Sequence, residues 1–74
     1  MPGKLKNRLR VLRAERGITQ IDLAIKANVS HSSYWRIENG YDMPSDVVQL
    51  RLARALKCEL VELGFTTAAR ELVS

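Results

Sequence analysis

Polar side chains between His31 and Arg36 have no evident part in a hydrophobic core. In a helix that begins at residue 31, four side chains fall on one face, at the spacing i, i+1, i+4 and i+5: His31, Ser32, Trp35 and Arg36. Arg36 has no apparent duty other than binding. A short helix with an exposed polar face is what reading of the DNA major groove requires. The pattern therefore favours a groove-reading helix, and the alternative is a solvent-facing helix of a protein-binding module.

The residue types and spacing in this sequence indicate neither a catalytic site nor a metal site. No nucleophile or acidic partner stands at a sensible spacing from His31, so we expect no enzyme activity. Cys58 and His31 are the only residues of their types, and two such side chains cannot fill the four-ligand shell of a structural zinc ion. A single cysteine also excludes an internal disulfide, and we expect Cys58 to be a small buried residue. We expect no metal, cofactor or small-molecule ligand.

Length and composition set the scale of the protein. Its 74 residues allow one domain, with a core over about residues 5–64 and with residues 65–74 as a short tail or a dimerisation extension. No apolar run approaches the roughly 20 residues that span a bilayer. The basic N-terminus lacks the apolar stretch of a secretory signal. We therefore expect a cytoplasmic protein that does not enter membranes.

The positive charge is unevenly spread along the chain. Residues 1–40 carry eight lysines and arginines against three acidic residues, whereas residues 41–74 carry four against five. A basic half joined to a near-neutral half suits a protein with one face for an anionic partner and another for self-association. A merely solvated basic surface fits the same charge count.

Apolar spacing and stop signals predict an all-α chain with five helices. The first helix is expected over residues 4–16, with Leu5, Leu9 and Leu12 as its apolar stripe and Gly17 as its left-handed end. A fourth helix is expected over residues 46–56 and a short fifth over residues 59–63. Residues 65–74 are expected to form either a short helix or a loose tail.

Capping residues predict the second and third helices, which are joined by a tight turn. Thr19 is a suitable N-cap for a helix over residues 20–27, and Ser30 for a helix that runs to about residue 39. Asn28 lies between them, where the turn needs a left-handed residue. Tyr34 and Ile37 should point inward from the third helix, opposite its polar face.

Three stretches of the chain resemble the lambda-repressor-like helix-turn-helix proteins of phage and bacterial regulators, also called the Xre family. The stretches are LRVLRAERGITQIDLA, ANVSHSSYWRIENG and PSDVVQLRLARALKCELVEL, and together they cover about residues 8–63. Spacing, caps, glycines and helix order all agree with the family. The resemblance implies a five-helix DNA-binding domain in which the second and third helices form the helix-turn-helix.

The resemblance assigns base reading to the third helix. His31, Ser32 and Arg36 occupy positions where the family places base-reading side chains, and Arg36 would bond a guanine at O6 and N7. Trp35 stands where the family usually has a small or polar residue. It would stack on a deoxyribose, meet a thymine methyl group or cover the neighbouring loop.

The resemblance also implies contacts with the DNA backbone and one structural ion pair. Three residues match backbone-contacting positions of the family: Gln20, Ser33 and Asn39. Gln20, at the start of the second helix, would bond a phosphate beside the positive end of that helix. Arg13 and Glu38 match a charge pair that ties the first helix to the third.

These observations lead to one leading hypothesis for function, a homodimeric transcriptional regulator that is a repressor or resembles a restriction-modification controller. One helix reads few base pairs, so discrimination requires a two-fold dimer on a palindromic operator in double-stranded DNA. Apolar side chains that exceed what so small a core can hide indicate the dimer surface: Leu60, Val61, Leu63 and Phe65. The alternative is a protein-interaction module of the same fold, such as an antitoxin or coregulator.

Overall fold

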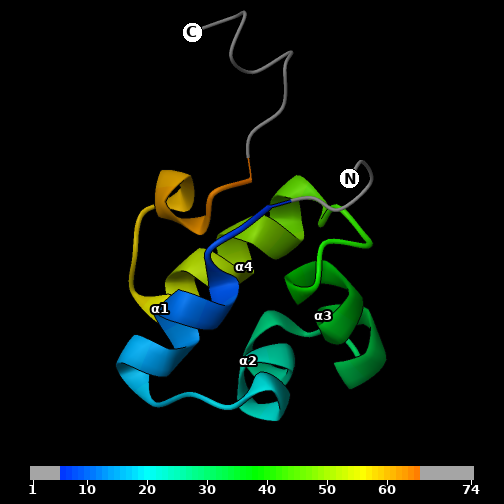
Figure 1. The fold of residues 1–74 in the computed structure, drawn as a ribbon, viewed down its shortest axis with the longest axis horizontal. Helices are drawn as coiled ribbons and strands as arrows, with labels where there is room; N and C mark the ends of the chain where they lie inside the picture. The colour runs from blue at the N-terminus through cyan, green and yellow to red at the C-terminus, as the bar shows by residue number, and fades with distance from the viewer. Residues whose placement is uncertain (1–5, 66–74) are drawn as a thin grey trace, which may run out of the picture.

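The computed structural model describes residues 6–65, which fold into four α-helices and one short 3-10 helix (Figure 1). The elements in chain order are α1 (Leu9–Arg16), α2 (Gln20–Ala27), α3 (His31–Glu38), α4 (Asp46–Leu56) and η1 (Leu60–Leu63). This part of the chain contains no strand, and the predicted all-α class is confirmed. None of its helices has the length and apolar character needed to cross a membrane.

The structure does not confirm a fifth α-helix, because the short helix expected over residues 59–63 is a 3-10 helix over Leu60–Leu63. This 3-10 turn follows α4, and its last residue, Leu63, is buried. Four residues are too few for an α-helical hydrogen-bond ladder, whereas a 3-10 turn needs only i→i+3 bonds. The expected alternatives for the tail, a helix or a loose end, concern residues 66–74, which lie outside the described part of the chain.

The first helix begins five residues later than the sequence predicts. Asn7 is the physical reason, because its Oδ1 accepts a hydrogen bond from the Leu9 amide at 2.9 Å while its amide nitrogen donates to the carbonyl of Ile37 at 3.0 Å. The Arg8 amide donates to the carbonyl of Leu63 at 2.9 Å. The residues before Leu9 thus tie α1 to the end of α3 and to η1, and long-range bonds replace the helical turn expected there.

Local signals set the other helix ends as predicted. The hydroxyls of Thr19, Ser30 and Ser45 accept backbone hydrogen bonds at the starts of α2, α3 and α4, at 3.1 to 3.3 Å. Asn28 lies in the left-handed region with φ 59° and ends α2. The α2–α3 pair is therefore a helix–turn–helix unit whose boundaries follow from caps and turn residues alone.

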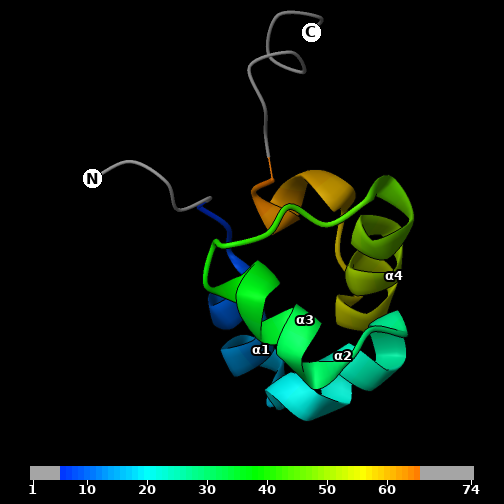
Figure 2. The same cartoon turned by 90° about the vertical axis from the view of Figure 1, so that its right-hand side faces the viewer.

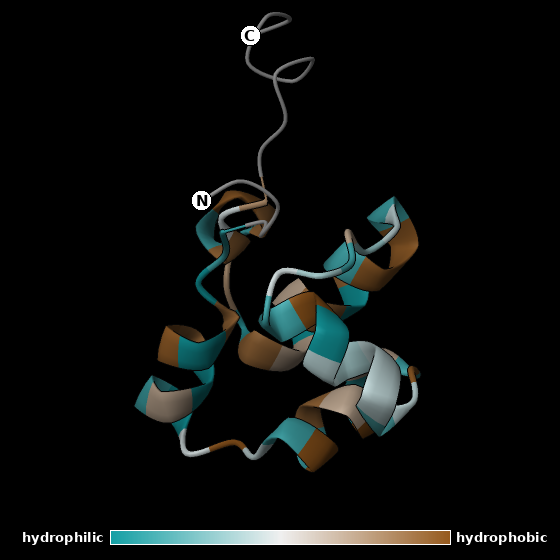
Figure 3. Ribbon diagram, turned by 45° about the vertical axis from the view of Figure 1, so that its right-hand side comes forward, coloured by the Kyte–Doolittle hydropathy of each residue, from teal (hydrophilic) through white to brown (hydrophobic). Residues whose placement is uncertain are grey.

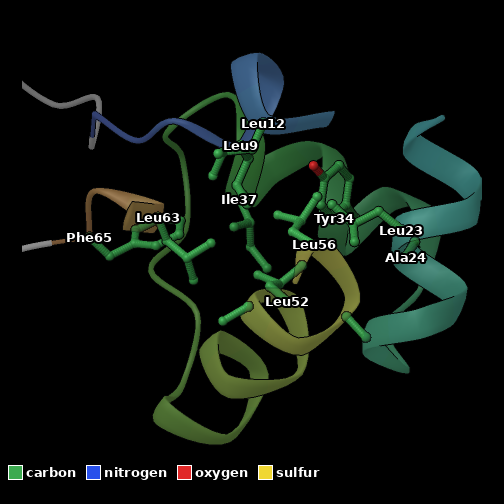
Figure 4. Close-up of a cluster of buried hydrophobic side chains, with 12 residues drawn as sticks. Leu9, Leu12, Leu23, Ala24, Tyr34, Ile37, Leu52, Leu56, Leu63 and Phe65 are labelled. Carbon is green, nitrogen blue, oxygen red and sulfur yellow. The ribbon is translucent and has the colours of Figure 1, made fainter. Parts of the chain in front are cut away.

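The hydrophobic core lies where the helices converge (Figure 4). Its fully or almost fully buried members come from every element: Leu9, Leu12, Leu23, Ala24, Ala27, Tyr34, Ile37, Leu52, Ala53, Leu56, Leu63 and Phe65. Hydropathy colours alternate within the helices, as expected when each buries only one side (Figure 3). Tyr34 and Ile37 point inward as predicted, which leaves the opposite side of α3 uncovered (Figure 2).

Two of the four residues expected on a dimer surface belong to this core. Leu63 is fully buried and Phe65 is only 4% exposed, because the 3-10 turn directs Leu63 inward against α4. The expectation that these two side chains lie on the surface is wrong. Leu60 and Val61 are exposed, and Val61 is 76% accessible.

Replacement of Lys57 by glycine is expected to stabilise the domain. Lys57 ends α4 with φ 55°, a left-handed conformation that costs a residue with a Cβ about 1 kcal/mol or more. Glycine removes that strain but loses more chain entropy on folding, so we expect a net gain of about 0.5 kcal/mol and a Tm higher by about 2–4 °C. Thermal unfolding followed by circular dichroism measures the change.

Gly17→Ala is the matched control for the Lys57 substitution. Gly17 has φ 65°, and a Cβ built there would meet no atom within 4 Å, so only backbone strain can act. We expect this variant to lose about 1 kcal/mol. A Lys57→Gly variant that melts below the parent would show that the left-handed end of α4 carries no strain.

Candidate nucleic-acid interface

The outer side of α3 is a continuous exposed surface. Its four predicted base-reading residues line one shallow concavity of about 530 Å³: His31, Ser32, Trp35 and Arg36. Tyr34 and Ile37 anchor the other side of the helix in the core. The structure therefore brings the predicted group together on one surface, and that surface has no role in packing the core.

The loop after α3 folds back over this surface. The rings of Trp35 and Tyr41 stack with centroids 5.6 Å apart and planes inclined by 16°. Trp35 remains 46% exposed, so one part of its ring covers the loop and another part is open to a ligand. Of the roles left open for Trp35 by its sequence, the covering of the neighbouring loop is present in the structure.

Arg36 has a partner that the sequence analysis missed. Its Nε donates to Asp42 Oδ2 at 2.8 Å and its Nη2 donates to Asp42 Oδ1 at 3.2 Å. The hydrogen bond with Asp42 raises the pKa of Arg36 and lowers the pKa of Asp42. The expectation that Arg36 has no duty other than binding is therefore wrong, although half of its side chain is still exposed.

Glu38 forms the centre of a buried polar cluster that fixes α3 to α1. Its side chain has no exposed surface, and its Oε1 accepts a 2.7 Å hydrogen bond from Arg13 Nε and another from the Tyr34 hydroxyl. Arg13 Nη2 donates to Oε2 at 3.1 Å, which makes the pair bidentate. The ion pair implied by the family resemblance is thus present, with Tyr34 as an additional donor.

The same cluster shifts the pKa values of its members. Burial by itself would raise the pKa of Glu38, but hydrogen bonds from Arg13, Tyr34 and Gln20 outweigh it and lower the pKa to about 2. The bond to Glu38 raises the pKa of Arg13. Burial and the adjacent carboxylate raise the pKa of Tyr34. All three groups therefore keep one charge state throughout the neutral range, as a structural support requires.

Gln20 links this cluster to the exposed side of α3. Its amide nitrogen donates to Glu38 Oε2 at 2.9 Å, and its Oε1 lies 3.3 Å from His31 Nε2, within hydrogen-bond distance when that nitrogen carries a proton. A primary amide nitrogen has two hydrogens, so Gln20 keeps one for a further acceptor at the start of α2. The predicted phosphate-contacting residue is thereby oriented by the structural ion pair.

The two other predicted backbone contacts lie on either end of α3. Ser33 is exposed in the first turn. Asn39 ends the helix, where its amide nitrogen donates to the carbonyl of Trp35 at 2.9 Å and its Oδ1 accepts from Arg10 Nη2 at 3.3 Å. Arg10 also approaches Glu38 at 3.5 Å and is 69% exposed, so α1 contributes a cation to this edge.

Tyr41 and Asp42 are the functional candidates that sequence reasoning missed. Both follow Gly40, and the one available signal was that glycine, since a left-handed residue after a helix turns the chain back over its last turn. Cys58, by contrast, is partly buried against the core, and burial raises the pKa of its thiol. Within residues 6–65 no three histidine, cysteine or acidic side chains gather as a metal site would require.

Comparisons with known proteins agree with this geometry. A family model described as a helix-turn-helix domain matches residues 5–64. The chain is similar to the restriction-modification controller protein C.AhdI from Aeromonas hydrophila, with 38% sequence identity, a TM-score of 0.71, and coverage of 74% of this chain and 83% of that one. A search of curated proteins finds no match.

Two further solved structures share the architecture. The clp gene regulator ClgR from Corynebacterium glutamicum is 28% identical with a TM-score of 0.70, and the match covers 73% of this chain and 57% of that one. The hypothetical transcription factor NHTF from Neisseria has a TM-score of 0.72 over 90% of this chain and 76% of that one. Its identity of 19% supports likeness of fold alone.

Proposed function

The chain belongs to the helix-turn-helix family, and on that premise we propose that it is a homodimeric transcriptional regulator that binds a palindromic operator in double-stranded DNA. DNA binding is the activity of the family domain, whereas sequence specificity, the dimer and the palindrome are the proposal. Its likeness to a restriction-modification controller protein supports a role as a controller or repressor of transcription.

The observation that carries the proposal is the exposed concavity on α3. His31, Ser32, Trp35 and Arg36 line it together and leave the core to the opposite side of the helix. An α-helix fits the major groove of B-form DNA, where arginine, serine and histidine meet base edges. Trp35 and Arg36 also contact the loop after α3, but none of the four side chains is part of the hydrophobic core, and all four remain exposed to a ligand.

The elements around α3 supply candidates for phosphate contacts. The spare amide hydrogen of Gln20 lies at the start of α2, where the helix dipole also favours an anion. Ser33 lies in the first turn of α3, and Asn39 lies at its C-terminal end. Such contacts would set the position of α3 on the duplex, and the side chains in the concavity would read the sequence.

Selection of tight binders from a random duplex library, at two salt concentrations, tests the proposal. We expect a palindrome with half-site centres about 10 base pairs apart, because a two-fold dimer places two recognition helices about one turn of DNA apart. Enrichment of no sequence, with retention that disappears at moderate salt, would leave only electrostatic affinity. That result would overturn the proposal and favour a module that binds a protein.

A negative charge on η1 is expected to weaken the proposed dimer. Val61 is 76% exposed on the near-neutral half of the chain, and beside it Leu60 is also exposed. A carboxylate buried at an apolar interface lacks a partner, so we expect Val61→Asp to raise the dimer dissociation constant at least about tenfold. Sedimentation equilibrium measures the constant.

Ile25→Asp is the matched control for the dimer experiment. Ile25 is 70% exposed on α2 and therefore tests the same substitution at a similar exposure on another face. We expect it to leave the dimer constant unchanged. An equal effect of the two substitutions, or none of Val61→Asp, would rule out η1 as the dimer surface.

A further inference from the structure

We propose that Asp42 is a specificity-determining residue that holds Arg36 in the orientation needed to bond a guanine through two hydrogen bonds. The inference rests on the proposed function, since it concerns how α3 reads one base pair. Asp42 would not itself touch the base, so it is a positioning residue.

The backbone fixes the place of Asp42 relative to Arg36. Gly40 has φ 85°, a left-handed conformation that turns the chain back over the last turn of α3. As a result the amides of Tyr41 and Asp42 both donate to the carbonyl of Arg36, at 2.8 and 3.3 Å. The carboxylate of Asp42 is therefore positioned by main-chain bonds to the residue whose side chain it binds.

The ion pair leaves the reading edge of the guanidinium free. Asp42 accepts from Nε and Nη2, so it occupies one side of the planar group. A guanidinium has five N–H donors, and the remaining ones lie on Nη1 and on the outer side of Nη2. Within residues 6–65, Arg36 Nη1 donates no hydrogen bond. That outer edge presents two parallel donors, which match O6 and N7 of guanine.

The aromatic stack limits the other movements of Arg36. The Arg36 Cζ lies 6.0 Å from the centroid of the Tyr41 ring, which is itself stacked on Trp35. The guanidinium is thus bounded by a carboxylate on one edge and by an aromatic ring on one side. Arginine loses much rotamer freedom when it binds a base, and a side chain ordered beforehand has less to lose.

Removal of the negative charge of Asp42 should have two opposite effects, one on general DNA affinity and one on discrimination at a single base pair. A carboxylate beside a DNA surface repels phosphates, so its removal alone should strengthen binding to every sequence. A positioning role predicts the opposite at one base pair, because a mobile Arg36 distinguishes guanine less well from other bases. Asp42→Asn therefore separates the two effects: general affinity should rise while discrimination at that base pair falls.

The experiment uses the full chain and single-base variants of the operator obtained by selection. Arg36→Lys first identifies the base pair that Arg36 reads, since lysine cannot form the bidentate contact. At that base pair we expect Asp42→Asn to reduce the ratio of dissociation constants, substituted over selected base, about three- to tenfold, within the range of one bidentate contact. Ratios at the other base pairs should change less than about twofold.

Two control variants distinguish a change in discrimination from the general effect of removing one negative charge, and a folding check accompanies them. Asp22→Asn removes one exposed negative charge from α2 that is not the partner of Arg36, and it should raise general affinity without changing any ratio. Asp42→Asn in the Arg36→Lys background should cause no further loss of discrimination, because the positioned group is already absent. Circular dichroism establishes that each variant is folded, and Asp42 lies in an exposed loop outside the core.

The possible outcomes separate this inference from the proposed function. Specific binding by the parent chain, with an unchanged ratio in Asp42→Asn at the base pair of Arg36, overturns the inference alone. A ratio that increases would mean that Asp42 restrains Arg36 from binding, and this also overturns it. If the parent chain selects no sequence, the proposed function fails and the inference fails with it.

Discussion

Replacement of Glu38 by glutamine is expected to destabilise the domain by about 3 kcal/mol at pH 7, the largest effect on folding stability of any substitution considered for this chain. Glu38 is fully buried at its side chain and accepts hydrogen bonds from Arg13, Tyr34 and Gln20. Its neutralisation leaves the Arg13 guanidinium, 15% exposed, without its counter-charge. Chemical denaturation with urea measures the free energy of unfolding, and a domain of this size has little to spare.

Glu15→Gln is the control for the substitution at Glu38. Glu15 is also paired with an arginine, Arg16, at 3.3 Å, but its side chain is 58% exposed. Because water screens such a pair, we expect a loss of at most about 1 kcal/mol. Equal destabilisation by the two substitutions would show that the cluster around Glu38 contributes no more than an ordinary surface pair.

The pH dependence of the free energy of unfolding is a second measure of what Glu38 contributes to stability. The pKa of Glu38 is about 2 in the folded chain, below its ordinary value of 4.5. The group therefore stabilises the fold above about pH 4.5, and this contribution of about 3 kcal/mol is lost as pH falls from about 5 towards 2. We expect the Glu38→Gln variant to lack this part of the acid transition. An identical acid dependence in both proteins would contradict the lowered pKa.

Replacement of Arg36 by alanine is expected to have the largest effect on binding. Each half-site of the proposed operator would lose a bidentate contact with guanine, at about 1–3 kcal/mol per half-site. The substitution also leaves Asp42 without its cation on a surface that faces DNA. Fluorescence anisotropy with the selected operator and with an unrelated duplex, at one fixed salt concentration, measures both affinities. Only the affinity for the selected operator should fall strongly.

Arg54→Ala is the matched control for Arg36→Ala. Arg54 is an exposed arginine on α4, outside the concavity on α3. Its removal takes away the same charge, so we expect a small loss that is equal for the two duplexes. Operator binding that survives Arg36→Ala unchanged would remove Arg36 from the reading surface, and the inference about Asp42 would fall with it.

The elements that depend on local interactions could be predicted from the amino-acid sequence. The bounds of α2, the serine and threonine caps and the left-handed turn at Asn28 all follow from residues within four positions of one another. The one-sided polar face of α3 follows from helical periodicity in the same way. Such features are readable because a short stretch of chain already contains both partners of each interaction.

The contacts between residues far apart in the chain could not be predicted from the sequence and became known from the fold. Asn7 bonds the end of α3 and so shortens α1, and Leu63 turns inward and leaves the proposed dimer surface to Leu60 and Val61. The ring stack and the carboxylate beside Arg36 depend on the direction in which the loop leaves α3. The bond between Gln20 and Glu38 joins residues 18 positions apart. These contacts depend on the path of the backbone between elements, and the packing of the whole core sets that path.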